Sequence, residues 1–107
     1  MSGLELIFAK KVSNLTIWDI AWCPHDNQFV VCGGDKIVHL FKVDIDPING
    51  SVSVDEVGSL EDAHKRTIRR CQWSPDNKFL ASVSFDGTCV GLVRYIVSMY
   101  YHLSIEI

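Results

Sequence analysis

The sequence predicts an all-β fold made of two consecutive four-stranded antiparallel sheets that do not close on themselves. Short apolar runs, such as 17–22 and 68–73, are each followed by a turn that contains Pro and Asp-Asn. Pro fixes its own φ, and Asp and Asn bond back to the backbone, so these clusters reverse the chain between strands. The same pattern then occurs a second time further along the chain.

The second occurrence is an internal repeat with a constant offset. Its first copy contains Ile17, Trp22, Pro24 and Asp35, and its second copy contains Ile68, Trp73, Pro75 and Asp86. A period of roughly 40–50 residues is typical of β-propeller blades, each of which is a four-stranded sheet. The repeat therefore predicts blade 1 at about 10–60, an imperfect blade 2 at about 61–92, and a divergent tail at 93–107.

The strands of blade 1 follow from apolar runs and from the turns between them. We expect strands at 17–22, 29–32, 37–43 and 51–55, with a further strand at 4–9 before the blade and a linker at 58–62 after it. Gly33-Gly34 and Asn49-Gly50 mark two of the reversals, because Gly tolerates positive φ and Asn-Gly favours tight hairpins.

Blade 2 follows the same sequence pattern up to Thr88 and departs from it afterwards. Strands are expected at 68–73 and 79–83, with a turn at Asp86-Gly87. After Thr88, the segment 89–93 lacks the expected aromatic residue at the end of a third strand. The tail 97–107 alternates apolar and polar residues, so it predicts a strand but starts no third repeat.

Composition limits the class of function. The chain of 107 residues is 48% hydrophobic and 21% charged, with a net charge of −3, which describes a globular protein and argues against a nucleic-acid binder. Its four cysteines form no Cys-x-x-Cys pair, so we expect reduced structural thiols, no metal and no cofactor. A targeting segment and a membrane-spanning run of about 18 apolar residues are not expected.

Aromatic and histidine residues outside the turns have simple structural interpretations. Trp22 and Trp73 are expected in the core, since each ends an apolar run. His25 in a turn and His39 on a strand are expected to face solvent or to be satisfied by hydrogen bonds.

The repeats resemble WD-repeat (WD40) blades. In that family a His before the first strand, a Ser or Thr on the second, a turn Asp and a Trp on the third form a hydrogen-bonded network. The resemblance gives these roles to His64, to Ser82 or Ser84, and to Asp86, with Asp35 as the turn Asp of blade 1. Blade 1 lacks the His, and the Trp positions hold Phe41 and Leu92.

Residues 10–88 resemble more specifically the cytosolic iron–sulfur protein assembly members of the WD-repeat family. The segments that carry this likeness are Ile17-Trp18-Asp19-Ile20, 63–75 and 81–86. The likeness implies a non-catalytic scaffold in the cytoplasm, and also in the nucleus, that binds iron–sulfur assembly and targeting factors and helps deliver clusters to cytosolic and nuclear apoproteins. From the composition, neither nucleic acid nor a membrane is expected as a partner. Since that family has seven blades, we interpret this chain as a truncated form.

Four residues are candidates for partner binding. Trp18 and Arg69 occupy the same position of the two repeats, while Arg66 and Phe85 lie in the neighbouring turns. Trp and Arg dominate binding hot spots, and loops on rigid scaffolds often bind partners. The alternatives are a solvated basic loop for the arginines and a place in the core for Trp18.

The sequence also fits other hypotheses about function. A generic WD-repeat interaction module of another complex, and a truncated product without a function of its own, both fit the repeats. A hydrolase that uses His64, Asp86 and a serine would need a nucleophile elbow, and the sequence contains no Gly-x-Ser-x-Gly. Two blades cannot close, so we expect a marginally stable monomer that self-associates through its open faces.

Overall fold

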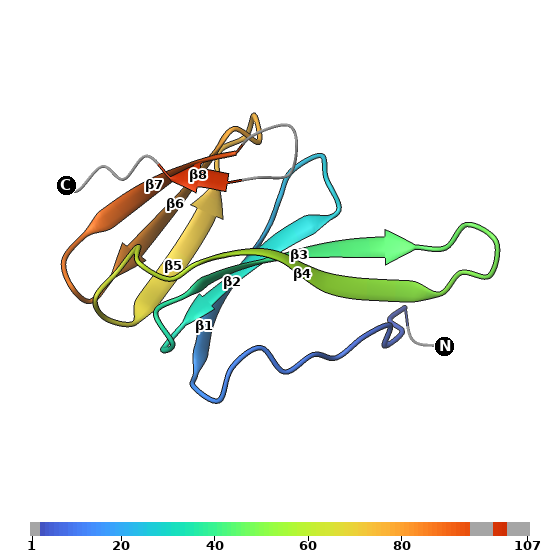
Figure 1. Cartoon of the computed structure of the whole chain (residues 1–107). Coiled ribbons are helices and arrows are strands. Elements are labelled where there is room, and N and C mark those ends of the chain that lie inside the picture. Colours follow the sequence, from blue (N-terminus) through green and yellow to red (C-terminus); the bar gives the residue numbers. More distant parts are fainter. Residues whose placement is uncertain (1–2, 95–99, 103–107) are drawn as a thin grey trace.

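The computed structural model describes residues 3–94 and 100–102, which form two four-stranded antiparallel sheets (Figure 1). Consecutive strands are neighbours in both sheets, so each sheet is a meander. The first sheet holds β1 (Ile17–Trp22), β2 (Gln28–Gly33), β3 (Val38–Ile45) and β4 (Val52–Leu60), and the second holds β5 (Ile68–Trp73), β6 (Phe79–Ser84), β7 (Cys89–Arg94) and β8 (Tyr100–His102). The expectation of an all-β chain with two open sheets is confirmed.

The Pro-containing turns reverse the chain where the sequence predicts. The amide of Cys23 donates to the carbonyl of Gln28 at 2.8 Å, and the amide of Ser74 donates to the carbonyl of Phe79 at the same distance. His25 and Asn77 adopt positive φ in these turns. Because each turn closes at the same repeat position, the apolar runs on either side are brought into register as pairs.

The two sheets pack face to face along β1, β2 and β5. Hydrogen bonds cross the interface: the indole Nε1 of Trp73 donates to the carbonyl of Ala21 at 3.2 Å, and the amide of Cys71 donates to Oδ2 of Asp19 at 2.9 Å. Side chains from both sheets fill the space between them, namely Cys23, Val30, Cys32, Val38, Leu40, Ile68, Cys71, Trp73, Leu80, Val90 and Leu92. This shared core makes the two repeats one packed unit.

The far side of the first sheet carries a second, smaller apolar cluster. Phe29, Val31, Phe41 and Val43 are buried there, and Phe8 and Val12 of the N-terminal segment pack over them. The expectation that Trp22 lies in the core is wrong. Its ring lies 4.9 Å from that of Phe29, but the residue is 54% exposed, because the N-terminal segment covers only part of this side. Trp73, at the same repeat position, is 5% exposed and meets the expectation.

The predicted strand at 4–9 is absent from the described structure. This segment instead runs beside the first sheet, near β4 in Figure 1, without joining its ladder. Phe8 stacks on Phe29 with ring centres 6.1 Å apart, and the ammonium of Lys10 donates to the carbonyl of Val54 at 3.3 Å. Side-chain packing, rather than strand pairing, therefore holds the segment.

Strand β4 is longer than predicted and includes part of the expected linker at 58–62. A bulge at Val57 separates the pairs Leu40–Gly58 and Phe41–Glu56, and pairing continues to Leu60. The bulge absorbs the break in alternation that suggested a strand end. The hairpin of β3 and β4 consequently extends well beyond the other strands (Figure 1).

The second sheet is more regular than its sequence suggests. Strand β7 pairs with β6 from Phe79–Val93 to Val83–Cys89, although its pattern departs from the repeat. Of the strand predicted at 97–107, only β8 is described, paired antiparallel with the end of β7. The rest of that prediction lies outside the described residues.

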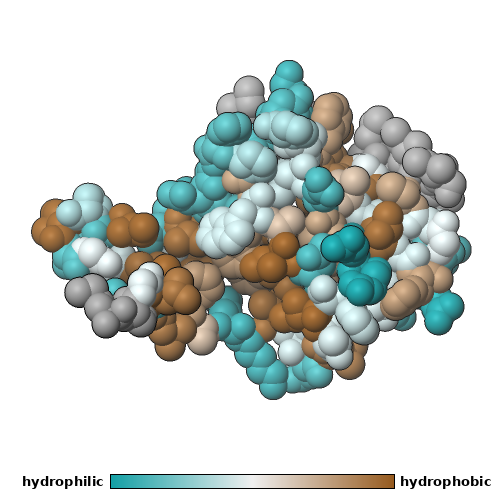
Figure 2. Space-filling model, turned by 180° about the vertical axis from the view of Figure 1, so that it is seen from behind, coloured by the Kyte–Doolittle hydropathy of each residue, from teal (hydrophilic) through white to brown (hydrophobic). Residues whose placement is uncertain are grey.

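Large apolar side chains reach the surface of both sheets. Figure 2 shows brown, hydrophobic patches among the polar ones over the face opposite to that of Figure 1. The exposed members on the strands include Ile17, Trp18, Ile20, Trp22, Ile45, Val57, Phe79 and Val83. Across the described ranges, no helix has the length and apolarity to cross a membrane.

Gly33 offers a test of the packing at the start of β1. It pairs with Ile17, and a Cβ at this position would lie 2.2 Å from the carbonyl oxygen of Thr16. We expect Gly33→Ala to lower the free energy of unfolding by about 1–3 kcal/mol, because the backbone must shift to relieve the clash. Chemical denaturation measures the change. Gly3→Ala is the control, since no heavy atom lies within 4 Å of its added Cβ, and equal denaturation midpoints for the two variants would contradict this account.

Candidate functional site

The site is organised by matching β-bulges in the first strand of each sheet. In β1 the register shifts between Ile17 and Asp19, and in β5 it shifts between Ile68 and Arg70. The extra residues are therefore Trp18 and Arg69. A bulge bends its strand and re-aims the side chain of the extra residue, so both repeats direct one side chain out of the regular ladder.

The two bulge residues contact each other across the sheets. The guanidinium carbon of Arg69 lies 4.7 Å from the ring centre of Trp18, which is a cation–π contact. Trp18 remains 44% exposed and Arg69 is exposed as well. Of the two alternatives for Trp18, the structure shows the surface position. An exposed contact of this kind contributes about 0.5–1 kcal/mol, so it orients the side chains without hiding them.

Arg66 and Phe85 lie in two loops that are joined by backbone hydrogen bonds. Oγ of Ser84 donates to the carbonyl of Arg66 at 3.0 Å, and the amide of Phe85 donates to the carbonyl of Thr67 at 3.2 Å. Both Arg66 and Phe85 are exposed. The loops lead directly into and out of the strand ends near Arg69, so the candidate residues share one end of the second sheet.

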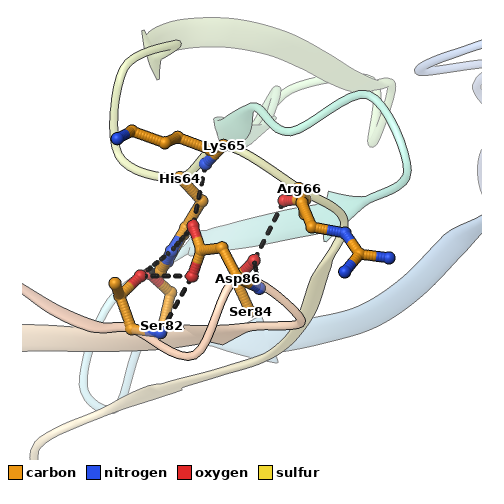
Figure 3. Close-up of polar contacts among 7 residues, drawn as sticks. His64, Lys65, Arg66, Ser82, Ser84 and Asp86 are labelled. Carbon is orange, nitrogen blue, oxygen red and sulfur yellow. Dashed lines mark hydrogen bonds and ion pairs between the residues drawn. The ribbon is translucent and has the colours of Figure 1, made fainter.

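His64 is buried at the centre of the polar network that supports these loops (Figure 3). Its Nδ1 lies 2.9 Å from Oγ1 of Thr88, and its Nε2 lies 2.8 Å from Oγ of Ser82. Ser82 is on β6, and Thr88 immediately precedes β7. The imidazole therefore ties the segment before β5 to the two central strands of its sheet.

Asp86 holds the other side of this network. Its carboxylate accepts hydrogen bonds from the amide of Lys65 at 2.8 Å, and from the amide and hydroxyl of Thr88 at 2.8 and 2.5 Å. These bonds, first the one from the Thr88 hydroxyl and then the one from the Lys65 amide, hold the pKa of Asp86 well below its ordinary value. The nearest distance between its Oδ2 and Nδ1 of His64 is 3.5 Å.

The two serines that the sequence analysis left as alternatives have different contacts. Ser82 bonds to His64, whereas Ser84 accepts from the amide of Asp86 at 3.1 Å and donates to the carbonyl of Arg66. Thr88 was missed as a network member. The signal for it is local, since a Thr two residues after an Asp is placed to donate back to that carboxylate.

Blade 1 forms a different network around its turn Asp. Oδ2 of Asp35 lies 2.7 Å from Nε2 of His39, and Oε1 of Glu56 lies 2.5 Å from Nδ1 of the same ring. Of the two expectations for His39, exposure to solvent or satisfaction by hydrogen bonds, the structure shows the second, and the residue is buried. Glu56 is a partner that the sequence did not indicate. Because both ring nitrogens face carboxylates, both must donate, which requires the imidazolium form.

The environment of His39 acts on its pKa in opposite directions. Burial lowers the pKa, but the hydrogen bonds to Asp35 and Glu56, with the charge of the two carboxylates, outweigh burial and raise it above its ordinary value. Within the described part of the chain, no group of three or more His, Cys, Asp or Glu side chains is arranged to hold a metal ion.

The His64 network predicts a cost for losing one hydroxyl. Ser82→Ala leaves Nε2 of His64 buried without its partner, and an unsatisfied buried group costs about 1–3 kcal/mol. Chemical denaturation checks the loss, with Ser53→Ala on the exposed side of β4 as the matched control. A Ser82→Ala midpoint equal to that of the control would contradict the network's role in stability.

The His39 network predicts a pH dependence. Because the folded pKa is raised, this stabilisation is fully present below the unfolded pKa of about 6.5 and is lost as the pH rises through the folded pKa. We expect His39→Gln to remove this alkaline loss from the pH profile of the unfolding free energy. Nitrogen-15 NMR of the imidazole checks the assignment, and a ring that titrates below the ordinary value would refute it.

With this geometry in place, the chain can be compared with known proteins. The family model described as "WD domain, G-beta repeat" matches residues 9–42 and 55–90. Among solved structures, Sqt1 of Saccharomyces cerevisiae superposes with a TM-score of 0.71 at 15% identity, over 86% of this chain and 23% of that one. This second likeness concerns the fold alone.

Three of the curated relatives illustrate the likeness. Protein CIA1 of Arabidopsis thaliana is 34% identical over 80% of this chain and 26% of its own length. The probable cytosolic iron-sulfur protein assembly protein CIAO1 homolog of Schistosoma japonicum is 36% identical over 73% of this chain and 21% of its own. The probable cytosolic iron-sulfur protein assembly protein Ciao1 of Culex quinquefasciatus is 39% identical, with shares of 67% and 20%.

These relatives are much longer proteins, since the chain spans about a quarter or less of their length. The family match covers well over half of this chain; its first segment spans β1, β2 and the start of β3, and its second runs from within β4 through β5 and β6 into β7. Each segment contains its blade's turn Asp, Asp35 or Asp86, together with the bulged first strand. The chain belongs to the WD-repeat family.

Proposed function

We propose that this chain is a non-catalytic WD-repeat scaffold of cytosolic iron–sulfur protein assembly. In this function it works in the cytoplasm, binds assembly and targeting factors, and helps deliver clusters to cytosolic and nuclear apoproteins. The observation that carries the proposal is the likeness, at 36% and 39% identity, to two relatives whose names state this assembly function. The cluster is cargo passed between partners and not a resident cofactor of this chain.

The burial and hydrogen bonds of His64, Ser82 and Asp86, the residues that suggested a hydrolase, support the non-catalytic part of the proposal. Ser82 is 1% exposed, and its hydroxyl is bonded to buried His64. Asp86 is occupied by Lys65 and Thr88. A catalytic serine must reach a substrate carbonyl beside an oxyanion site. These contacts instead favour a role in joining the loops to the sheet.

We propose that partners dock at the end of the sheets marked by Trp18, Arg66, Arg69 and Phe85. All four side chains are exposed. The His64 and Asp86 network fixes the loops that carry Arg66 and Phe85, and one of these loops leads into Arg69 on β5. Aromatic and arginine side chains on a rigid support lose little freedom on binding, which is why they dominate hot spots. The exposed apolar side chains of both sheets also support association with a further chain, including a second copy.

Depletion of the chain in cells that express it tests the assembly function. We expect less radiolabelled iron in cytosolic and nuclear iron–sulfur proteins, while mitochondrial iron–sulfur proteins keep theirs. Re-expression of the same chain should restore the label. Unchanged label in the cytosolic proteins would contradict the proposal and favour an interaction module of another complex.

Substitution of the docking residues tests the surface. Trp18→Ala and Arg69→Ala are expected to reduce the affinity for co-purifying assembly factors at least about tenfold, the size expected of hot-spot residues. Binding titrations with those factors measure the change. Lys78→Ala is the matched control, because this exposed cation lies in the turn at the opposite end of β5. Equal affinities for all three variants would show that the arginines belong to a solvated loop.

A further inference from the structure

Two buried thiols face each other across the interface between the sheets. Cys32 lies on β2 and is 1% exposed, and Cys71 lies on β5 and is 6% exposed. Their Sγ atoms are 3.4 Å apart, and both side chains are free thiols. Neither residue takes part in the His networks or in the proposed docking surface, so the pair has no assigned role.

The distance suits formation of a disulfide. A disulfide has an S–S length of about 2.0 Å, so the sulfurs need to approach by only about 1.4 Å. The hydrogen bond from the Cys71 amide to Asp19 holds β5 against β1, where Asp19 is the pairing partner of Cys32. A metal would need further ligands, and no group of three suitable side chains exists in the described residues. The contact therefore fits a two-thiol redox pair.

We propose that Cys32 and Cys71 are an oxidation site that forms a disulfide between the two blades when the chain meets hydrogen peroxide. The thiolate of one cysteine attacks a peroxide oxygen, the O–O bond breaks, and a sulfenic acid and one water form once the leaving hydroxide takes a proton. The second thiol attacks the sulfenic sulfur, the S–O bond breaks, and a second water leaves with the thiol proton. Two thiols are oxidised and one peroxide is reduced to two waters.

The surroundings of the pair support the first step. The hydrogen bond with Cys71 lowers the pKa of Cys32, against the opposing effects of burial and of Asp19 and Asp35. The same hydrogen bond and burial raise the pKa of Cys71, so the first thiolate forms at Cys32. A cleft of about 480 Å³ lined by Cys71, Asp19 and Arg70 lets a small oxidant reach Cys71, whose Sγ lies 3.4 Å from that of Cys32.

A bond here would join positions 39 residues apart in the chain and fix β2 to β5. Closing a loop of this size restricts the unfolded chain, so the oxidised form should unfold at a higher temperature by several degrees. The cross-link would hold the sheets in the relative position that brings Arg69 over the ring of Trp18. This inference is independent of the proposed function.

The test is thiol mapping after exposure of the folded chain to hydrogen peroxide. Free thiols are then blocked with N-ethylmaleimide in denaturant, and tryptic peptides are sequenced by mass spectrometry. We expect a linked pair of peptides 12–36 and 71–78, with fragmentation placing the bond on Cys32 rather than Cys23. Its mass should be about two daltons below the sum of the two thiol peptides, and dithiothreitol should reverse it.

Matched variants separate this bond from general oxidation. Cys71→Val keeps an apolar side chain in the core and should abolish both the linked peptides and the rise in unfolding temperature, whereas Cys89→Ser should leave both unchanged. Wild-type peptide mapping decides the question even where a variant fails to fold. The proposal is overturned if the wild type yields only unlinked peptides, a bond to Cys23 or Cys89, or disulfides between separate chains.

Discussion

Packing of β5 against the first sheet is the contact on which the other features of the molecule depend. Each sheet alone is a four-stranded meander, and the main core forms only where the two meet. Asp19 and Trp73 contribute polar contacts to this interface, since each bonds to a backbone group of the opposite sheet. The stacking of Trp18 on Arg69 exists only because this interface sets the distance between the two bulges. The surface and the core are thus consequences of the same contact.

The two blades satisfy their turn Asp by different chemistry. In blade 2, His64 comes from before the first strand and meets two uncharged hydroxyls, while Asp86 is held mainly by backbone amides and Thr88. In blade 1, His39 comes from the third strand and lies between the carboxylates of Asp35 and Glu56. The ring in blade 2 therefore relies on neutral donors and acceptors, whereas the ring in blade 1 relies on charge. Blade 1 is therefore the part of the chain whose stability depends on the protonation of a histidine.

Local sequence patterns were enough to predict most of the strands, but not the contacts between residues distant in the chain. The bounds of β1 and β5 match the expected ranges, because apolar runs that end at Pro-containing turns determine them within a few residues. His64 bonds to Ser82, one of the two serines that the family resemblance offered, whereas Asp86 bonds to Lys65 and Thr88, which it did not single out. Glu56 lies 17 residues from His39, and its role depends on a bulge that no alternation reveals. The segment 4–9 has the composition of a strand but packs by its side chains, which depends on the neighbouring sheet face.

Trp22 and Trp73 show that burial in such an array depends on the neighbouring unit more than on the residue. They occupy one repeat position and pair with Phe29 and Leu80 of the next strand, and yet Trp22 is exposed and Trp73 is buried. Trp73 meets the first sheet, whereas the side of Trp22 is covered only in part by the N-terminal segment. The same holds for the side of the second sheet that faces away from the first. Val83 is exposed there, whereas Cys32, at the same repeat position of the first sheet, is buried. In stacked repeats the interfaces carry much of the stability. A measurement on this chain alone consequently reports one complete interface and two sheet sides that are open or only partly covered.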